Sequence, residues 1–498
     1  MICPNCNEEI PEGKKFCGHC GHRLISTDLV DREPQPHVEP ETPETPTPAP
    51  GAQKSHTPPA DVTKRGLPGW VWGLVGAVAV VLVLIATGTI NIGSAIPEII
   101  VVTEASPTEE PDKQESIVAT IEDEYGCDDP IGCVTYGADE PVRIASALVI
   151  SGPNTDLGTD SQYGVEIAID FKGDLLGHAI ELQAEDDGCS AEGGQTAGQK
   201  IVSDPTIIAV VGTSCSGAGV PMSEVISEAG YAMVSPSNTA PSLTDPDQAW
   251  NPGYLRTAHN DKVQGKAMAD FAYNVLGVTT AAAIHDGDPY TEGLARVFAD
   301  AFEEIGGTIV EFTAVNKGDT DMRPVLSAVA AAGPPELLYY PVFTAEGGFL
   351  TKQAKEVTGL EGTILAAADG MISIAAIEAV GEAGEGMYFS GPDLSFSGGT
   401  YEKFLAAYVE KYGSEPISVF HAHSFDAANM IFACVEEVGV QDGDNLHIGR
   451  QALRTCLSAT SGFEGITGTL TCNEYGDCAD PKISVSQLQG GGYVRIWP

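Results

Sequence analysis

Short apolar runs alternate with longer amphipathic stretches over residues 141–498 of the chain. A run of roughly four to eight apolar residues bounded by turn-forming residues predicts a buried strand, and apolar residues that recur every three or four positions predict a helix. Val142–Val149 is the first predicted strand, and Gln162–Phe171 is the helix expected to follow it. The other predicted strands are Ile180–Ala184, Ile207–Val211, Ala232–Val234, Ala281–His285, Thr308–Phe312, Leu337–Tyr340, Thr363–Ala366 and Met387–Ser390. This alternation predicts α/β architecture, with parallel sheets covered by helices on both faces.

Two successive predicted strands end in loops of small and hydroxyl-bearing residues. The strand Ile207–Val211 leads into Gly212–Gly219, and the next strand leads into Ser235–Pro241. Ligands bind at the carboxyl ends of the strands in open parallel sheets, and backbone N–H groups at a helix start favour an anion, so the loops predict a binding site. Taken singly, Ser216 is more typical of a helix cap and Thr239 of a turn. The presence of two such loops on neighbouring strands favours a site.

Composition narrows the class of protein. The formal net charge of −45 argues against nucleic acid as a partner, because phosphate backbones bind basic surfaces. The sequence contains no G-x-S-x-G elbow, no H-E-x-x-H pair and no phosphate-binding loop, so an enzyme is only a third hypothesis. His421 and His423 resemble a metal pair, but no third ligand is near in sequence. A position at a helix start near the cleft is the preferred interpretation of this pair.

Two CxxC motifs lie within residues 1–23, at the N-terminal end of the chain. Cys3, Cys6, Cys17 and Cys20 supply four thiolates, the set that holds structural Zn²⁺ in a tetrahedron. Such a short segment cannot bury a core, so the metal would provide its folding energy, and no ligand position stays open for catalysis. Two disulfides are the alternative, which a reducing cytoplasmic location disfavours. The segment resembles the zinc-ribbon domains at the start of many membrane-anchored prokaryotic proteins.

A membrane anchor is predicted at residues 67–92, after a disordered Pro-rich linker at residues 24–66. Its apolar stretch Trp70–Ile92 is long enough, at about 1.5 Å per residue, to span a hydrocarbon core of about 30 Å. Lys64 and Arg65 precede the stretch, so the positive-inside rule places the N-terminus in the cytoplasm and the C-terminal part outside. A cleaved signal peptide is the alternative, and the distance of the stretch from the N-terminus argues against it.

The cysteines after residue 126 would then lie on the oxidising side of the membrane, where disulfides form. Residues 93–140 predict an acidic stalk that ends in a small loop closed by Cys127 and Cys133. A metal site at this pair is the weaker alternative, because no other thiol or His lies near it in sequence. Closeness in sequence predicts two further disulfides, Cys434–Cys456 and Cys472–Cys478.

The α/β region also carries several short motifs, which are Ser151-Gly152-Pro153, Asp186-Asp187-Gly188-Cys189, Gly212 through Ser216, Ser235-Pro236 with Thr239-Ala240-Pro241, and His285-Asp286 with Tyr290 and Glu292-Gly293-Leu294-Ala295. In order and spacing they resemble the leucine/isoleucine/valine-binding proteins, which are substrate-binding components of ABC transporters. The resemblance covers residues 141–498 and implies a type I periplasmic-binding fold, in which two Rossmann-like, parallel-sheet lobes are joined by a hinge of three chain crossings. The implied lobes are about 141–259 with 392–466, and about 260–391 with 467–498. The resemblance also implies a disulfide between Cys189 and Cys215.

The same resemblance assigns residues to an amino-acid ligand. The hydroxyl and backbone N–H groups of Ser216 and Thr239 would bind its α-carboxylate. The carbonyl oxygen of Ser237 and the carboxylate of Asp369 would accept from its ammonium group. A zwitterion that leaves water needs a partner at both ends, since the cost of desolvation otherwise cancels the gain.

Three aromatic residues lie where the family lines the side-chain pocket: Tyr290, Phe343 and Phe420. Core packing is the alternative for each, and for Phe420 it is an equal one. Leu157 stands where the family carries a Tyr in the first loop, and Asp369 is shorter than the usual Glu. These departures leave the ligand open and allow a larger, more polar or amide-type molecule.

The main functional hypothesis is a membrane-tethered, extracytoplasmic solute-binding protein. It would capture a branched-chain or similar amino acid between its lobes and present it to an ABC permease, with hinge closure and no bond chemistry. Its partners would be the amino acid, the permease and the lipid bilayer, and Zn²⁺ would be its only cofactor. The alternative is an extracellular ligand sensor that signals through the cytoplasmic zinc ribbon, although the linker and the stalk are poor mechanical couplers.

Overall fold

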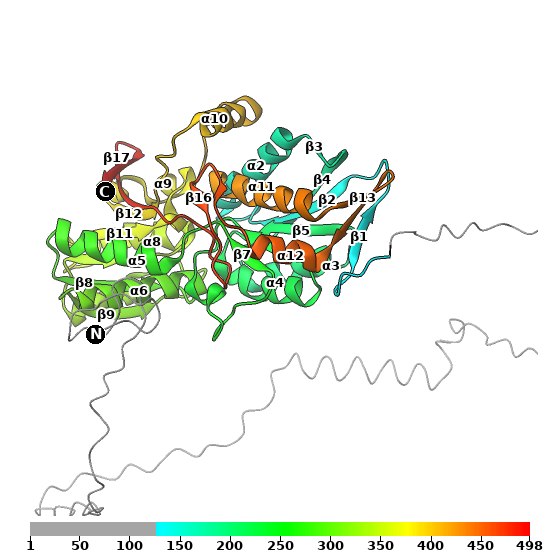
Figure 1. The fold of residues 1–498 in the computed structure, drawn as a ribbon. Coiled ribbons are helices and arrows are strands. Elements are labelled where there is room, and N and C mark those ends of the chain that lie inside the picture. Colours follow the sequence, from blue (N-terminus) through cyan, green and yellow to red (C-terminus); the bar gives the residue numbers. More distant parts are fainter. Residues whose placement is uncertain (1–125) are drawn as a thin grey trace, which may run out of the picture. The chain divides into compact units, whose positions relative to one another are not determined.

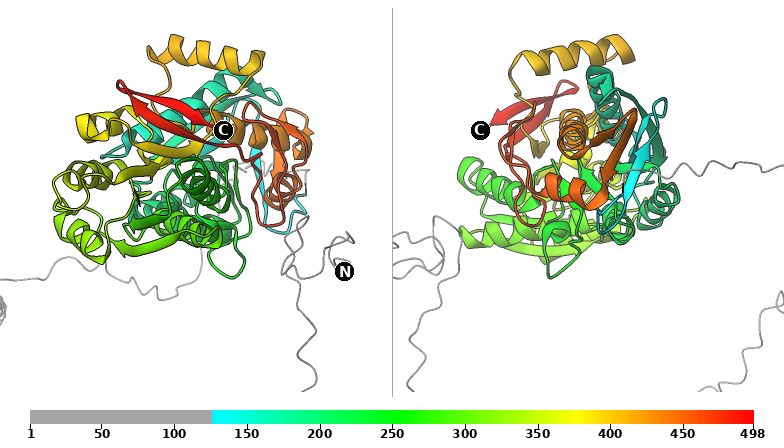
Figure 2. Two further views of the ribbon diagram at one scale, coloured as in Figure 1. Left: turned by 90° about the vertical axis from the view of Figure 1, so that its left-hand side faces the viewer. Right: turned by 45° about the vertical axis from the view of Figure 1, so that its right-hand side comes forward.

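Two large β-sheets with their covering helices, and two small sheets, make up residues 126–498, which are the residues described by the computed structural model (Figure 1). The predicted zinc ribbon, linker and membrane span, and the first part of the predicted stalk, lie outside the described residues. None of the helices in residues 126–498 is both long and apolar enough to cross a membrane. Two further views show the large sheets as the centres of two neighbouring lobes (Figure 2).

The first sheet has six strands in the order β3-β4-β2-β5-β6-β7, and every neighbouring pair except β3–β4 is parallel. Strand β5 is buried along its whole length, as expected for an apolar strand covered on both faces. The strands are β2 (Val142–Leu148), β3 (Asp174–Leu175), β4 (His178–Asp186), β5 (Ile207–Gly212), β6 (Ala232–Ser235) and β7 (Tyr254–Arg256). The helices of this lobe are α2 (Thr155–Lys172), α3 (Ala191–Val202), α4 (Ser216–Glu228), η1 (Pro241–Thr244), α10 (Gly399–Tyr412), α11 (His421–Val438) and α12 (Arg450–Ser458). Helix α3 packs against α4, and α2 packs against α11.

The second sheet has seven strands in the order β18-β17-β12-β11-β10-β8-β9. Strands β17 and β18 are antiparallel to their neighbours, so this sheet is mixed and not parallel throughout as expected. The strands are β8 (Thr280–His285), β9 (Thr308–Ala314), β10 (Leu337–Tyr339), β11 (Ile364–Ala368), β12 (Tyr388–Pro392), β17 (Ile483–Gln489) and β18 (Gly492–Trp497). The helices are α5 (Asp261–Asp270), η2 (Phe271–Val275), α6 (Pro289–Glu304), α7 (Arg323–Ala332), α8 (Thr344–Ala354), η3 (Asp369–Met371), α9 (Ile374–Val380) and η4 (Gly381–Gly384).

The first helix begins earlier than its hydrophobic pattern predicts, at Thr155 instead of Gln162. A close approach of backbone segments explains the difference. Gly158 lies so near the end of β2 that a Cβ at this position would come within 2.1 Å of the carbonyl oxygen of Val149. Only glycine allows the first turn of α2 to lie there, and such a turn has no apolar periodicity to recognise.

Part of the predicted stalk belongs to the folded unit. Strand β1 (Cys133–Tyr136) pairs antiparallel with β14 (Asn445–Gly449), which also pairs with β13 (Val440–Asp442). The side chains of Val134 and Tyr136 are buried in the first lobe's core. The folded unit therefore starts before residue 141, because these strand residues bury apolar surface.

All four predicted disulfides are confirmed: Cys127–Cys133, Cys189–Cys215, Cys434–Cys456 and Cys472–Cys478. The metal alternative for the first pair is therefore excluded, since both sulfurs are used in the bond.

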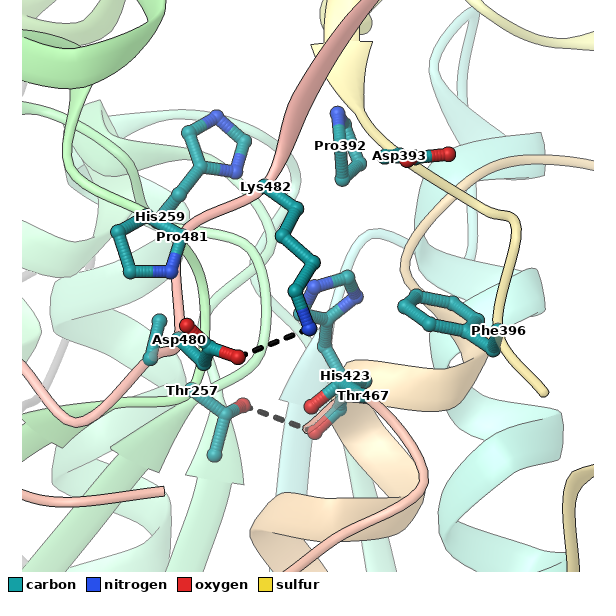
Figure 3. Close-up of a pocket in the computed structure, with 11 residues that line it drawn as sticks. Thr257, His259, Pro392, Asp393, Phe396, His423, Thr467, Asp480, Pro481 and Lys482 are labelled. Carbon is teal, nitrogen blue, oxygen red and sulfur yellow. Dashed lines mark hydrogen bonds and ion pairs between the residues drawn. The ribbon is translucent and has the colours of Figure 1, made fainter. Parts of the chain in front are cut away.

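The chain passes between the two sheets at three places. The first two follow β7 and β12, as expected, and the third lies between Cys478 and Ile483, later than the predicted boundary at residue 467. The reason is that the short pair β15 (Phe463–Glu464) and β16 (Thr469–Leu470) and the following disulfide loop stay with the first lobe, where Asp477 forms an ion pair with Arg256. Residues from all three crossings line a small pocket of about 10 Å³ (Figure 3). This volume admits no more than about one water molecule, so the hinge is closely packed.

Candidate ligand-binding site

The loops that follow β5 and β6 are joined by hydrogen bonds. The Ser235 hydroxyl donates to the carbonyl oxygen of Thr213 at 3.0 Å, and the Asn238 side-chain amide donates to the same oxygen at 3.0 Å. The backbone N–H of Ala240 donates to the hydroxyl oxygen of Ser216 at 3.2 Å. The two predicted loops therefore form one surface at the carboxyl edge of the first sheet, as the strand order suggests.

A buried arginine, Arg256, holds the loop after β6 through hydrogen bonds. The Arg256 side chain is fully buried and donates to the carbonyl oxygens of Asn238 at 3.1 Å and Ala240 at 2.8 Å. It also donates to the Thr244 hydroxyl at 2.8 Å and pairs with Asp477 at 2.6 Å. Thr239 lies between two carbonyl groups held by one guanidinium, which fixes the backbone at this position.

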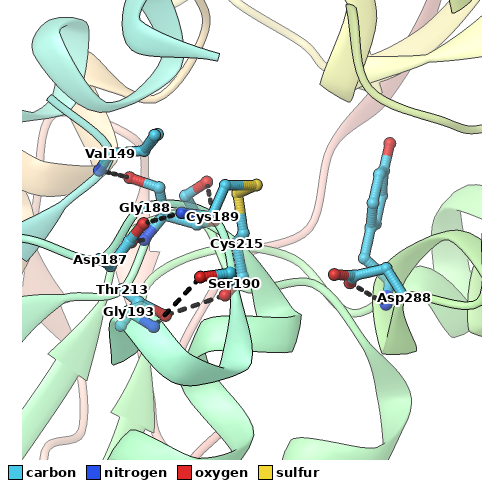
Figure 4. The surroundings of a disulfide bond; sticks show 12 residues. Val149, Asp187, Gly188, Cys189, Ser190, Gly193, Thr213, Cys215 and Asp288 are labelled. Carbon is cyan, nitrogen blue, oxygen red and sulfur yellow. Dashed lines mark hydrogen bonds between the residues drawn. A yellow bond between two sulfur atoms is a disulfide. The ribbon is translucent and has the colours of Figure 1, made fainter. Parts of the chain in front are cut away.

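A disulfide and a buried carboxyl group hold the first loop in place (Figure 4). Asp187 accepts from the backbone N–H of Cys189 at 2.7 Å and from that of Ser214 at 2.6 Å. Burial raises the pKa of Asp187 to about 7. The Cys189–Cys215 disulfide ties the same two segments covalently, and the Ser214 hydroxyl accepts from the N–H of Val149 at 3.1 Å. Three strand-end segments of the first lobe are thereby fixed relative to one another.

Asp369 lies on the opposite side, in the second lobe, directly after β11. Its side chain is 4% exposed, and its Oδ1 accepts from the Gln264 amide at 2.5 Å and from the Tyr290 hydroxyl at 3.1 Å. The Tyr290 hydroxyl also accepts from the N–H of Gly370 at 3.1 Å. Burial raises the pKa of Asp369 to about 6. The carboxyl group is therefore held in a fixed orientation by two donors.

A second carboxyl group, not predicted from the sequence, lies close to Asp369. Asp261 is fully buried, and neither side-chain oxygen has a hydrogen-bond partner within residues 126–498. Burial and the charge of Asp369 raise the pKa of Asp261 well above its usual range. The Thr239 hydroxyl and the Nδ1 of His259 are also buried without a partner in this part of the chain. Buried polar atoms without partners are rare, so this cluster indicates the position of a ligand or of bound water.

The predicted side-chain residues come together in one apolar cluster. Leu157 and Phe420 come from the first lobe, and Tyr290 and Phe343 come from the second. The rings of Tyr290 and Phe343 are 5.3 Å apart, and the cluster includes the Cys189–Cys215 disulfide. Of the predicted head-group residues, Ser216, Ser237 and Thr239 are all buried, and the Ser237 hydroxyl donates to the carbonyl oxygen of Ser214 at 2.8 Å.

The two histidines at the start of α11, His421 and His423, are both buried. The Nδ1 of His421 lies 3.0 Å from Asp160, which also accepts from the N–H of Phe420 at 3.2 Å. His423 is buried, and its pKa is lowered to about 3 by burial. Across residues 126–498, no group of three or more His, Cys, Asp or Glu side chains is arranged to hold a metal ion. Asp160 therefore holds both the His421 ring and the backbone of Phe420.

Direct contacts connect the lobes across the cleft. The Asp156 carboxylate accepts from the N–H of Ala375 at 2.8 Å, at the start of α9. The Lys317 ammonium pairs with Asp288 at 2.6 Å and lies 3.5 Å from the carbonyl oxygen of Cys189. The cleft is thus closed on the residues described above.

This combination of two α/β lobes, three crossings and a polar site enclosed between them defines a hinged binding protein. The chain belongs to the periplasmic binding protein family, whose model matches residues 141–491. The zinc-ribbon domain model matches residues 2–24, which contain the four predicted zinc ligands.

Similarity to named proteins also supports membership of this family. The chain is 28% identical to the "Leu/Ile/Val-binding protein homolog 3" of Brucella melitensis over 71% of this chain and 93% of the relative. It is 26% identical to the Leu/Ile/Val-binding protein of Escherichia coli K12, over 71% and 92%. A crystal structure of a leucine binding protein from Thermotoga maritima matches with a TM-score of 0.64 and 26% identity, over 71% of this chain and 97% of that one. These relatives are named as binding proteins and not as enzymes.

Proposed function

We propose that the chain is the substrate-binding component of an ABC transporter and that it binds the α-amino-acid head group between its lobes. The observation that supports this most strongly is the position of Asp369 opposite the loops that carry Ser216 and Thr239. A carboxylate on one wall, and hydroxyl and N–H groups on the other, match the two charges of a zwitterion. The unpartnered hydroxyl of Thr239 and the unpartnered carboxyl of Asp261 would gain partners when the ligand enters.

The assignment of individual contacts is part of the same proposal. Ser216 and Thr239 hold the carboxylate, and the Ser237 carbonyl oxygen and Asp369 hold the ammonium group. Tyr290, Phe343, Phe420 and Leu157 surround the side chain. The work of the protein is hinge closure, followed by delivery of the ligand to an ABC permease.

The same proposal covers the N-terminal part of the chain. Residues 67–92 anchor the protein in the membrane, and Cys3, Cys6, Cys17 and Cys20 hold Zn²⁺ on the cytoplasmic side. The measurement is labelling of intact cells with a membrane-impermeant thiol reagent, before and after permeabilisation in the presence of a chelator. These cysteines are expected to be labelled only after both treatments, and labelling of intact cells would contradict the topology.

The binding proposal is tested by calorimetry. The purified protein is unfolded and refolded to remove any retained ligand, and is then titrated with the twenty amino acids. At least one amino acid is expected to give a measurable heat of binding. The corresponding α-hydroxy acid, which lacks the ammonium group, is expected not to bind. Equal binding of both compounds would rule out recognition of the head group.

A further inference from the structure

A cavity of about 390 Å³ lies between the lobes, beside the predicted side-chain pocket. The first lobe contributes Val149, residues 151–154 and residues 188–190, and the second contributes Lys317, Phe343 and Glu346, among others. Phe343 belongs both to this cavity and to the aromatic cluster with Tyr290. The cavity is therefore the continuation of the side-chain pocket toward the mouth of the cleft.

A carboxylate with unused hydrogen-bonding capacity faces this cavity. Glu346 is only 7% exposed, and one of its oxygens accepts from the N–H of Gly318 at 2.8 Å. Its other oxygen accepts no hydrogen bond from any residue in 126–498. This oxygen can therefore accept from a donor that the ligand or bound water supplies.

The cavity also holds one donor of fixed position. The Lys317 ammonium pairs with Asp288, contacts the carbonyl oxygen of Cys189 and lies 5.4 Å from the centre of the Phe343 ring. An ammonium group has three N–H bonds, so these contacts leave capacity for a further acceptor. The charge of Glu346 raises the pKa of Lys317, as does that of Asp288, so the two groups that face the cavity interact electrostatically.

The Glu346 carboxylate and the Lys317 ammonium group favour a neutral group that both donates and accepts. An aliphatic side chain would leave Glu346 without a donor in a site that it has dehydrated. A carboxylate can pair with Lys317 and a second ammonium group with Glu346, but each meets a like charge on the other residue. A carboxamide provides N–H groups for Glu346 and a carbonyl oxygen for Lys317.

Two aromatic rings connect the surroundings of Asp369 with those of Lys317. The Tyr290 hydroxyl lies 3.1 Å from Asp369, the Tyr290 ring lies 5.3 Å from Phe343, and the Phe343 ring lies 5.4 Å from the Lys317 nitrogen. A linear side chain with a terminal amide or urea group can follow these rings from Asp369 toward the lysine.

We propose that this cavity receives the terminal carboxamide or ureido group of an amino-acid ligand, and that the protein prefers such ligands to branched-chain ones. Glu346 accepts from the terminal N–H groups, and Lys317 donates to the terminal carbonyl oxygen. The inference rests on the proposed function, because Asp369, Ser216 and Thr239 must hold the other end of the molecule.

The test is calorimetry of the full-length protein with five probes: L-glutamine, L-citrulline, L-glutamate, L-leucine and L-norleucine. Glutamine or citrulline is expected to bind at least about tenfold more tightly than norleucine, since a satisfied hydrogen bond to a charged group contributes about 1.5–3 kcal/mol. Glu346→Leu is expected to remove this preference while norleucine binding changes little. Lys317→Met also loses the contact with the carbonyl oxygen of Cys189 across the cleft, so it is expected to weaken the binding of all five probes and that of glutamine or citrulline most. If Glu346→Leu does not fold, Glu346→Gln replaces it in the test, because the glutamine oxygen can still accept from the N–H of Gly318. Lys352→Met and Glu356→Leu, at exposed positions nearby, are the matched controls.

The possible results separate this inference from the proposed function. If leucine binds more tightly than glutamine and citrulline, or if the variants at Glu346 and Lys317 leave an amide preference unchanged, the cavity assignment is wrong and the head-group site stands. If none of the five probes and no other amino acid binds, or if Asp369→Ala binds as tightly as the parent, the proposed function itself fails.

Discussion

At the scale of single residues, the second-lobe wall of the cleft contains two buried carboxyl groups where the ligand brings one ammonium group. Burial and the neighbouring charge of Asp369 favour the protonated form of Asp261. Asp369 accepts hydrogen bonds from two donors, and its pKa is raised only to about 6. Asp369 therefore ionises more easily than Asp261. In the proposed site, Asp369 would therefore offer the negative charge to the ligand, with Asp261 as a neutral neighbour.

This assignment predicts how ligand affinity depends on pH. The ammonium group binds the ionised form of Asp369, so affinity is expected to be constant above about pH 7 and to fall, by up to about tenfold per unit, as the pH drops below about 6. His259 does not interfere in this range, because burial lowers its pKa to about 4, and Tyr290 remains neutral because its pKa is raised. Titrations between pH 5 and 8, in buffers of different ionisation enthalpy, should show protons released on binding near pH 6. A flat profile in the parent protein, or a profile that Asp369→Asn does not change, would contradict the assignment.

Some residues of the candidate site could be predicted from the sequence, and others could not. Ser216, Thr239 and Asp369 were assigned through the resemblance, and all three are buried, the first two in the loops after β5 and β6 and the third directly after β11. Asp261 was not predicted, because an Asp after the capping residue Asn260 is typical of an exposed helix start. Its burial results from packing between the lobes, which no local pattern records.

At the scale of elements, the carboxyl ends of β2, β4 and β5 are joined by more than their sheet hydrogen bonds. The Cys189–Cys215 disulfide and the Asp187 carboxyl group connect the loops that follow these strands. The site needs such fixation because loops of small residues have little apolar surface with which to hold themselves in place.

Removal of this disulfide is expected to destabilise the fold more than removal of the small N-terminal one. Cys189→Ser with Cys215→Ser frees a loop with a sequence separation of 26, which corresponds to about 3.5 kcal/mol in the chain-entropy model. Cys127→Ser with Cys133→Ser frees a separation of 6, which corresponds to about 2.2 kcal/mol. Urea unfolding of both double variants checks the order, and an equal or reversed order would show that Asp187 alone holds the loops.

The strands that were predicted are those with buried, continuous apolar runs, such as β5 and β8. Strands β17 and β18 were not predicted, because the prediction relied on continuous apolar runs, whereas polar residues alternate with apolar ones in β17 and most of β18 is partly or fully exposed. Such alternation is the pattern of a half-buried strand. Strand β1 was assigned to the stalk for a related reason, since it is short and its partner β14 lies more than three hundred residues later in the chain. Pairing between distant segments has no signature in either segment alone.

At the scale of the whole molecule, the lobes meet where α4 and α6 approach each other. Gly217, in the first turn of α4, faces Asp288 of the second lobe, and a Cβ at Gly217 would lie 2.2 Å from the Asp288 Oδ2. The absence of a side chain at Gly217 therefore allows the cleft to close fully.

Gly217→Ala is expected to weaken ligand binding without weakening the fold. Alanine favours a helix over glycine, whereas the added methyl group has to displace Asp288 at a cost of about 1–3 kcal/mol, which corresponds to roughly fivefold to 150-fold in Kd. Gly399→Ala, at the start of α10, is the matched control because a Cβ there meets nothing within 4 Å. Calorimetry and thermal unfolding of both variants provide the comparison. Unchanged affinity in Gly217→Ala would mean that closure does not bring these helices together.

The most direct test of the central claim, that this cleft recognises an amino-acid head group through Asp369, is a comparison of ligand affinity between the parent and Asp369→Ala. The exposed Asp442→Ala is the control. Loss of the buried carboxylate leaves the ammonium group without its charged partner, so Asp369→Ala is expected to lose about 2–5 kcal/mol, or roughly 30-fold to several thousand-fold in Kd. Thr239→Ala is expected to lose less, about 1–3 kcal/mol, because backbone N–H groups still hold the carboxylate. Affinity in Asp369→Ala equal to that of the parent and of Asp442→Ala would contradict the account.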